Sequence, residues 1–179
     1  NRINWVHKSH GNYDFAIASW LRGKKEFKNL ILDLVSKFSP YIKEKKESVG
    51  IKVVHYPYRF LLGIKDTKNV FFEETDKKIE LDDLDKRILK ILCENARAPL
   101  VQMSNKLKIS PKALAYRIKK LEGNRIILGY RPLINHRLLG YSHYRIMFYL
   151  MNVTKEGFES FVDYLEKSPQ VFYIINEVG

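Results

Sequence analysis

The pattern of apolar positions predicts three short helices in the middle of the chain. In each, apolar residues recur every three or four positions and so share one face of a helix. The predicted bounds are about 83–95, 100–107 and 111–122. The three apolar faces are, in chain order, Leu84, Ile88, Ile91 and Leu92, then Leu100, Met103 and Leu107, then Leu114, Ile118 and Leu121. A β-prone run at 126–130 follows closely. Helix, helix, short turn, helix and strand in this order indicate a winged helix-turn-helix.

Helix-end signals support these bounds. Asp82 suits the N-cap of the first helix, where a side-chain oxygen can accept a bond from a free backbone N–H. Ser110 suits the N-cap of the third helix and Pro111 its first position. Gly123 suits the position just past the end of that helix.

Both ends of the chain are predicted to mix strands and helices. The predicted strands are 3–10, 13–20, 49–58, 144–153 and 171–178, and the predicted helices are 25–38 and a segment capped by Thr154. The helical apolar faces are Phe27, Leu30, Ile31 and Leu34, then Phe158, Phe161, Val162 and Leu165. The polar stretch 65–80 between the first group and the three central helices is predicted to be a linker.

The stretch VFYIINEVG at 171–179 is similar to INWVHKSHG at 3–11. Aligning Gly179 with Gly11 gives a repeat period of 179 − 11 = 168 residues. That period suits one helix-turn-helix plus one further small domain. Two apolar strands can also match by accident; if the repeat is real, the chain is a window from a tandem protein, which is the prediction adopted.

The charge distribution favours a polyanionic partner. The chain has 32 Lys and Arg against 20 Asp and Glu, a formal net charge of +12. Six basic residues and no acid lie between 105 and 120, across the turn and the third helix. A basic helix face is often only solvated, but the three-helix spacing and the cap at Ser110 favour duplex DNA as the partner. The predicted DNA-binding residues are Ser110, Pro111, Lys112, Ala113, Tyr116, Arg117, Lys119 and Lys120.

Composition also limits the location of the protein. Its longest apolar run, 146–151, is far shorter than the ~20 residues that a membrane helix needs, so no membrane partner is expected. The single Cys93 excludes an internal disulfide and suits a reducing compartment. We therefore expect a cytoplasmic protein.

The central segment resembles the DNA-binding domain of the Lrp/AsnC family of transcription regulators. LDDLDKRILKIL matches the family's L-D-x-x-D-x-x-I-L opening, PLVQMSNKLKISP its helix-turn-helix, and RIKKLEGNRIILGYRPLI its closing segment. Two departures stand out. Lys108 occupies the inter-helix turn, where the family commonly has Gly, and Ser104 lies where it commonly has Ala. Lys108 is therefore expected to adopt a left-handed conformation at modest cost.

The resemblance implies a fold class and a domain plan. Members of the family join the helix-turn-helix to a ferredoxin-like βαββαβ domain that pairs subunits and binds small effectors. We therefore predict an α+β protein with a winged helix-turn-helix flanked by partial ferredoxin-like effector domains. The predicted plan is the end of one such domain at 1–64, a linker at 65–80, the winged helix-turn-helix at 81–135 and the start of a second such domain at 143–179. The resemblance also implies a homo-oligomer or intramolecular pairing of tandem halves.

The function implied by the resemblance is sequence-specific DNA binding that responds to a small molecule such as an amino acid. The turn Gly11, Asn12, Tyr13 and Asp14 resembles the family's effector loop, although Gly and Asn also suit an ordinary tight turn. No catalytic residue, metal or cofactor is expected. Two alternatives remain: an enzyme similar to the related sirohaem decarboxylases, and an effector-binding assembly module without DNA binding.

Overall fold

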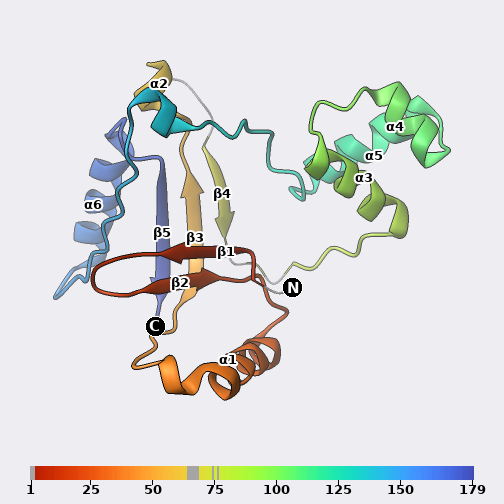
Figure 1. Ribbon diagram of the computed structural model, residues 1–179. Helices are drawn as coiled ribbons and strands as arrows, with labels where there is room; N and C mark the ends of the chain where they lie inside the picture. Colours follow the sequence, from red (N-terminus) through yellow and green to blue (C-terminus); the bar gives the residue numbers. More distant parts are fainter. Residues whose placement is uncertain (1–2, 64–68, 74, 76) are drawn as a thin grey trace. The chain divides into compact units, whose positions relative to one another are not determined.

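The computed structural model describes residues 3–63, 69–73, 75 and 77–179. The chain divides into two compact units, one comprising the chain up to Ser48 together with Gly179, the other Val49–Val178. Figure 1 shows the elements of both. In chain order they are β1 (Trp5–Lys8), β2 (Phe15–Ala18), α1 (Lys24–Phe38), η1 (Ser39–Tyr41), β3 (Val49–His55), α2 (Arg59–Leu62), β4 (Val70–Glu73), α3 (Asp83–Glu94), α4 (Leu100–Leu107), α5 (Pro111–Gly123), η2 (His136–Leu139), α6 (Lys155–Lys167) and β5 (Tyr173–Val178).

The first unit contains an antiparallel hairpin and a helix. Strands β1 and β2 pair with Trp5 opposite Ala18 and Lys8 opposite Phe15. Helix α1 ends before the Ser39–Pro40 pair, as predicted. Ser39 itself has helical angles, φ −50° and ψ −35°, and begins the short helix η1, but Pro40 has no N–H with which to continue the bonding of an α-helix. On its predicted apolar face, Leu30 is buried and Phe27, Ile31 and Leu34 are partly buried. The predicted strands 3–10 and 13–20 and the helix 25–38 are therefore confirmed, with shorter strands.

The second unit contains a three-stranded antiparallel sheet in the order β4-β3-β5. Strand β3 pairs along one edge with β4 and along the other with β5, where His55 lies opposite Tyr173. A register shift between Gly50 and Lys52 leaves an extra residue on β3, which is the pattern of a β-bulge. Helix α6 is capped by Thr154, whose Oγ1 accepts the N–H of Gly157 at 3.1 Å, as its sequence signal predicts.

A short segment after β3 forms hydrogen bonds with the end of α6. Tyr56 is fully buried, and its hydroxyl donates to Glu166 Oε1 at 2.7 Å. The Arg59 guanidinium lies over the Tyr56 ring and donates to the main-chain oxygens of Glu166, at 2.7 Å, and Ser168, at 3.0 Å. These carbonyls belong to the last turn of α6 and the residue after it, where helical partners run out. Arg59 therefore satisfies acceptors that the helix leaves open.

The predicted strand 144–153 and the predicted linker 65–80 require correction. All of 144–153 is described, and it contains no strand. Because β4 and β5 already occupy both edges of β3, that strand offers 144–153 no open edge. The segment is instead held by side chains, with Phe148 edge-on to Phe161 on α6.

The predicted linker contains strand β4, and residues 64–68, 74 and 76 lie outside the described part of the chain.

The three helices α3, α4 and α5 form a small bundle around one apolar core (Figure 1). Helix α4 has the predicted bounds, and α3 and α5 differ from theirs by one residue. Partly buried apolar side chains, Ile118 among them, surround the core. Leu100 was predicted to face inward, but it is 38 % exposed because it starts its helix at the edge of the bundle. The buried core residues are Ile88, Met103, Leu107, Leu114 and Leu121.

The end of α5 also differs from the prediction. Gly123 is the last helical residue rather than the one past the end, and the residue in the left-handed region is Arg125, with φ 59°. The predicted strand at 126–130 is not formed, although all five residues are described. The N–H groups of Ile126 and Ile127 instead donate to Leu121 O, at 2.9 and 3.2 Å, and so close the helix end. These bonds use backbone donors that a strand would need for pairing.

The turn between α4 and α5 has the conformation expected from its sequence. Lys108 has φ 57° and ψ 45°, the left-handed region that favours glycine. Ser104, the other departure from the family pattern, is buried, and its hydroxyl donates to Val101 O at 2.9 Å. The hydroxyl is thus satisfied within its own helix and places no unpaired polar atom in the core.

Relief of this backbone strain can be measured. We expect Lys108→Gly to be more stable than Lys108→Ala by about 1 kcal/mol, because both variants lose the side chain but only alanine keeps the Cβ that opposes a positive φ. Chemical denaturation followed by helical circular dichroism measures the difference. An alanine variant as stable as the glycine variant would show that Lys108 is not strained.

Candidate nucleic-acid interface

The first turn of α5 is built by its N-cap. Ser110 Oγ accepts the N–H of Ala113 at 3.2 Å, and Pro111 occupies the first turn with its ring-fixed φ. Lys112 and Ala113 are exposed beside this cap, and the next residue, Leu114, is fully buried. The cap thus fixes the side of the helix on which Lys112 and Ala113 lie.

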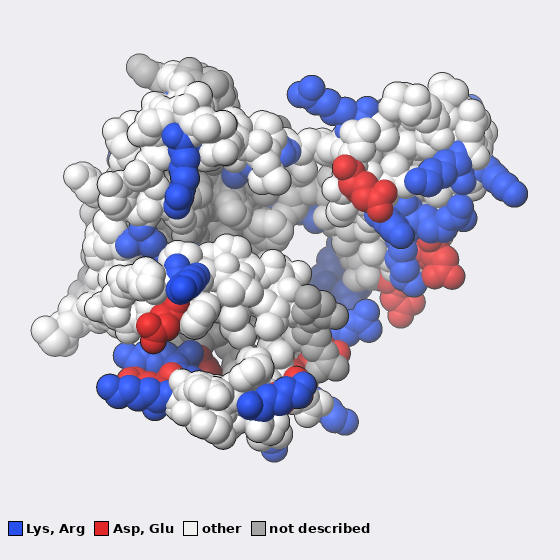
Figure 2. Space-filling view, in the orientation of Figure 1, with Lys and Arg blue, Asp and Glu red and all other residues white. Residues whose placement is uncertain are grey.

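The exposed side of α5 carries most of the predicted DNA-binding residues. Tyr116 is 69 % exposed, and Lys112, Lys119 and Lys120 are also exposed. Figure 2 shows Lys and Arg side chains gathered over the three-helix bundle, beside a few acidic ones. Among the described residues, none of these three lysines forms an ion pair with a carboxylate within 4.0 Å. Other lysines of the chain do form pairs at distances up to 4.0 Å. Lys112, Lys119 and Lys120 are therefore available to phosphate groups.

Arg117 differs from these lysines. Its Nη1 donates to Asp82 Oδ2 at 2.6 Å and to Asp85 Oδ1 at 2.8 Å. Its side chain is 31 % exposed, and that of Asp85 only 12 %. The N–H of Asp85 and the guanidinium of Arg117 lower the pKa of the Asp82 carboxyl, and the two aspartates raise the pKa of Arg117. Arg117 is predicted from the sequence to bind DNA, but this contact joins α5 to the start of α3.

Part of this contact could be predicted from the sequence. Asp82 was predicted as an N-cap, and its Oδ1 does accept the N–H of Asp85 at 2.7 Å. The N-cap prediction gives no partner for the second carboxylate oxygen of Asp82. Arg117 is the single arginine among the basic residues of 105–120. An arginine can bridge two carboxylates, whereas a lysine presents a compact point charge.

The predicted effector turn lies in the first unit. Gly11, Asn12 and Asp14 are exposed, and Tyr13 is partly buried. The Tyr13 hydroxyl lies 3.2 Å from His7 Nδ1, and Ser9 N donates to Asp14 O at 2.8 Å. Gly11 has neither a positive φ nor a neighbour that a Cβ would strike. Glycine is therefore not required there by backbone geometry.

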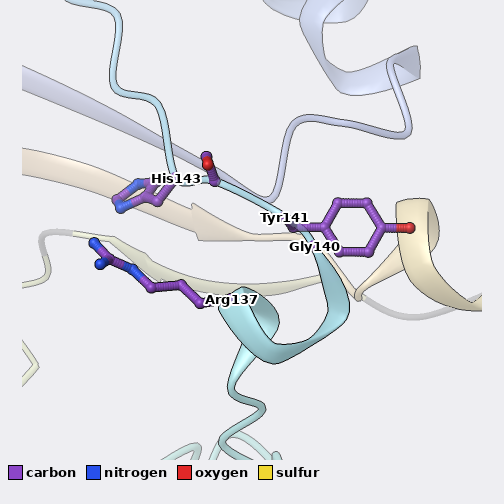
Figure 3. A pocket seen from close by; sticks show the side chains of 5 residues that line it. Arg137, Gly140, Tyr141 and His143 are labelled. Atoms are coloured by element: carbon purple, nitrogen blue, oxygen red, sulfur yellow. The ribbon is translucent and has the colours of Figure 1, made fainter.

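One pocket lies beside η2 in the second unit. Its lining residues are Arg137, Gly140, Tyr141, Ser142 and His143. Figure 3 shows that the Tyr141 ring points away from the side chains of Arg137 and His143. Because these side chains do not converge on a common point, the pocket offers no set of groups arranged around a ligand.

A three-helix bundle whose third helix is capped, exposed and basic is the architecture of a helix-turn-helix protein. Residues 81–122 match the model of the AsnC-type helix-turn-helix domain. The chain therefore contains a helix-turn-helix domain of the AsnC type, as its sequence motifs predict.

Individual relatives agree with this assignment. The HTH-type transcriptional regulator LrpA of Pyrococcus horikoshii is 47 % identical over 62 residues, which cover 35 % of this chain and 44 % of the relative. The proline dehydrogenase transcriptional activator of Rhodobacter capsulatus is 33 % identical over 92 residues, covering 51 % and 60 %. The regulator FL11 of Pyrococcus abyssi is 28 % identical over 102 residues, covering 57 % and 66 %. No solved structure matches the chain.

The matches cover only part of each protein. In the three relatives above, the chain spans 44 %, 60 % and 66 % of their own lengths. In the described part of the chain, none of the helices has the length and apolar character needed to span a bilayer.

Proposed function

We propose that this chain is part of a cytoplasmic transcription regulator that binds duplex DNA in a sequence-specific manner. The observation that carries the proposal is the exposed basic face of α5, with Lys112, Lys119 and Lys120 outside any ion pair found in the described residues. The relatives are named as transcriptional regulators or activators, which agrees with this role. No residue of the chain is assigned a catalytic role in this proposal.

Helix α5 acts as the recognition helix. Its N-terminal residues Ser110 to Ala113 approach base edges in the major groove, where each base pair presents a distinct set of donors and acceptors. Lys119 and Lys120 neutralise phosphates, which orients the helix without reading sequence. Tyr116 lies on the same exposed side and contributes contact area at the groove wall.

A salt titration of binding to a random duplex tests the charge component of this proposal. The logarithm of the association constant should fall linearly with the logarithm of salt concentration, with a slope of about −0.9 for each phosphate contacted. A slope near zero, or no binding at low salt, would refute the DNA-binding role.

Absorbance in the visible range of the purified protein separately tests the alternative of a tetrapyrrole enzyme.

We further propose that 1–64 and 143–179 are parts of ferredoxin-like domains that bind an effector and pair subunits or tandem halves. The pairing of β3 with β5 supports the part of this proposal that joins the two segments, because it places a strand from the front of the chain and one from its end in one sheet. The exposed turn Gly11, Asn12, Tyr13 and Asp14 supplies backbone N–H groups and a carboxylate for the charged ends of an amino acid.

The effector role predicts a specific loss. Asp14→Ala should abolish the change in DNA affinity caused by the responsive amino acid, found by screening the common amino acids, and leave DNA affinity without it within about twofold. Asp33→Ala removes another exposed carboxylate, from α1, and should leave the response intact. A normal response by the Asp14 variant would place the effector elsewhere.

A further inference from the structure

The basic residues on α5 fall into two groups that the structure separates. Lys112, Lys119 and Lys120 are exposed, whereas Arg117 lies partly buried between α5 and the beginning of α3. The core of the bundle holds α5 through Leu114 and Leu121, which set its distance from the other helices. Apolar contacts of this kind are non-directional, so rotation of a helix about its axis is better fixed by a directional polar contact.

Arg117 supplies a directional contact of this kind. A single nitrogen, Nη1, donates to a carboxylate oxygen of Asp82 and to one of Asp85, at 2.6 and 2.8 Å. Asp82 is itself fixed, because its other carboxylate oxygen accepts the N–H of Asp85 and so caps α3. The Asp82 carboxylate therefore caps α3 with one oxygen and holds Arg117 of α5 with the other.

We propose that Arg117 is a positioning residue, which sets the DNA sequence preference by orienting α5 through Asp82 and Asp85 and does not itself contact a base or phosphate. This inference rests on the proposed DNA-binding function. It assigns a role in DNA recognition to two acidic residues, which DNA would otherwise repel. Losing Arg117 also leaves the Asp85 carboxylate, only 12 % exposed, without its cation.

A double-mutant cycle separates positioning from direct contact. The variants are Arg117→Gln, the pair Asp82→Asn with Asp85→Asn, and the combination of all three. Asparagine keeps the N-cap at position 82, so α3 retains its start. The measured quantity is the ratio of affinities for a duplex selected from a random pool and for a random duplex, because general charge effects on binding largely cancel in this ratio.

We expect Arg117→Gln to lower this ratio at least tenfold and the triple variant to lower it no further than the aspartate pair does alone. The salt slope of random-duplex binding should be the same for Arg117→Gln and the wild type, since no phosphate contact is lost. Lys119→Gln is the matched control: its salt slope should become shallower by about 0.9, whereas its affinity ratio should stay close to that of the wild type, because a phosphate contact carries no sequence information.

Arg117→Lys covers the case in which Arg117→Gln fails to fold. Lysine keeps the charge that a phosphate contact needs, but its ammonium lies one bond nearer the backbone than Nη1 of arginine and so falls short of the place from which Nη1 contacts both carboxylates. The ratio should still fall at least fivefold. The positioning role alone would be overturned if Arg117→Lys had the same affinity ratio as the wild type. It would also be overturned if Arg117→Gln lowered the ratio by the same factor whether or not Asp82 and Asp85 had been replaced. Absence of duplex binding by the wild type would overturn the proposed function, and this inference with it.

Discussion

Replacing Leu114 by alanine is expected to lower the free energy of unfolding of the three-helix domain by about 2–5 kcal/mol. Leu114 is fully buried and belongs to the core formed with Ile88, Met103, Leu107 and Leu121. Truncation removes transfer free energy and leaves a cavity that the surrounding helices fill only in part. Small domains have about 5–15 kcal/mol of total stability, so this loss is a large fraction of it.

Chemical denaturation followed by helical circular dichroism measures this effect. Tyr116→Ala is the control, because it truncates a larger side chain two positions away that is 69 % exposed. We expect that control to change stability by less than about 0.5 kcal/mol. If the two substitutions cost the same, Leu114 and Tyr116 do not lie on opposite sides of α5 as described.

The largest effect on binding is expected from replacing Lys112, Lys119 and Lys120 together by alanine. If each lysine neutralises a phosphate, the salt slope of random-duplex binding becomes shallower by up to about 2.7, three times the contribution of a single contact. Affinity at low salt should fall by more than tenfold, because counterion release supplies most of non-specific binding. Stability should change little, since all three side chains are exposed.

A control of equal charge change distinguishes a local interface from net charge. Lys24, Lys25 and Lys28 lie on α1 in the first unit and are also exposed. Their triple alanine variant loses the same formal charge and should keep the wild-type salt slope. If both triple variants weaken binding equally, the attraction comes from the overall charge of +12 and not from α5.

Much of the helix-turn-helix could be predicted because its signals are local. Ser110 caps α5 through an N–H three residues away, and Asp82 caps α3 in the same way. Lys108 adopts the left-handed conformation that its place in the turn demands. Helical spacing identified the inward residues, since positions three and four apart share a face whatever the rest of the chain does.

The sheet was less predictable because strand pairing is decided by distant residues. The apolar run within 144–153 favours a strand, yet β3 already has β4 and β5 at its edges. Strand β4 lies in a stretch whose average composition is polar, and its short run Val70–Glu73 becomes a strand by pairing with β3. A strand is stable only with a partner edge, so the choice among candidates is not contained in any one segment.

The exposed side of α5 was predicted with one important exception. The exposed lysines of α5 follow from helical spacing alone, because they lie opposite Leu114 and Leu121. The pairing of Arg117 with Asp82 and Asp85 joins residues 35 and 32 positions apart. Only the packing of α5 against α3 brings them together, so helical spacing within α5 does not reveal the pair.

The central claim, sequence-specific recognition of duplex DNA by α5, is tested most directly by selection from a random pool. A duplex selected by the wild-type chain should bind at least about a thousandfold more tightly than a random duplex at the same salt concentration. Lys112→Ala should reduce that preference by about 1–3 kcal/mol if its side chain reads a base. A pool that shows no enrichment, with selected and random duplexes bound equally, would contradict the account.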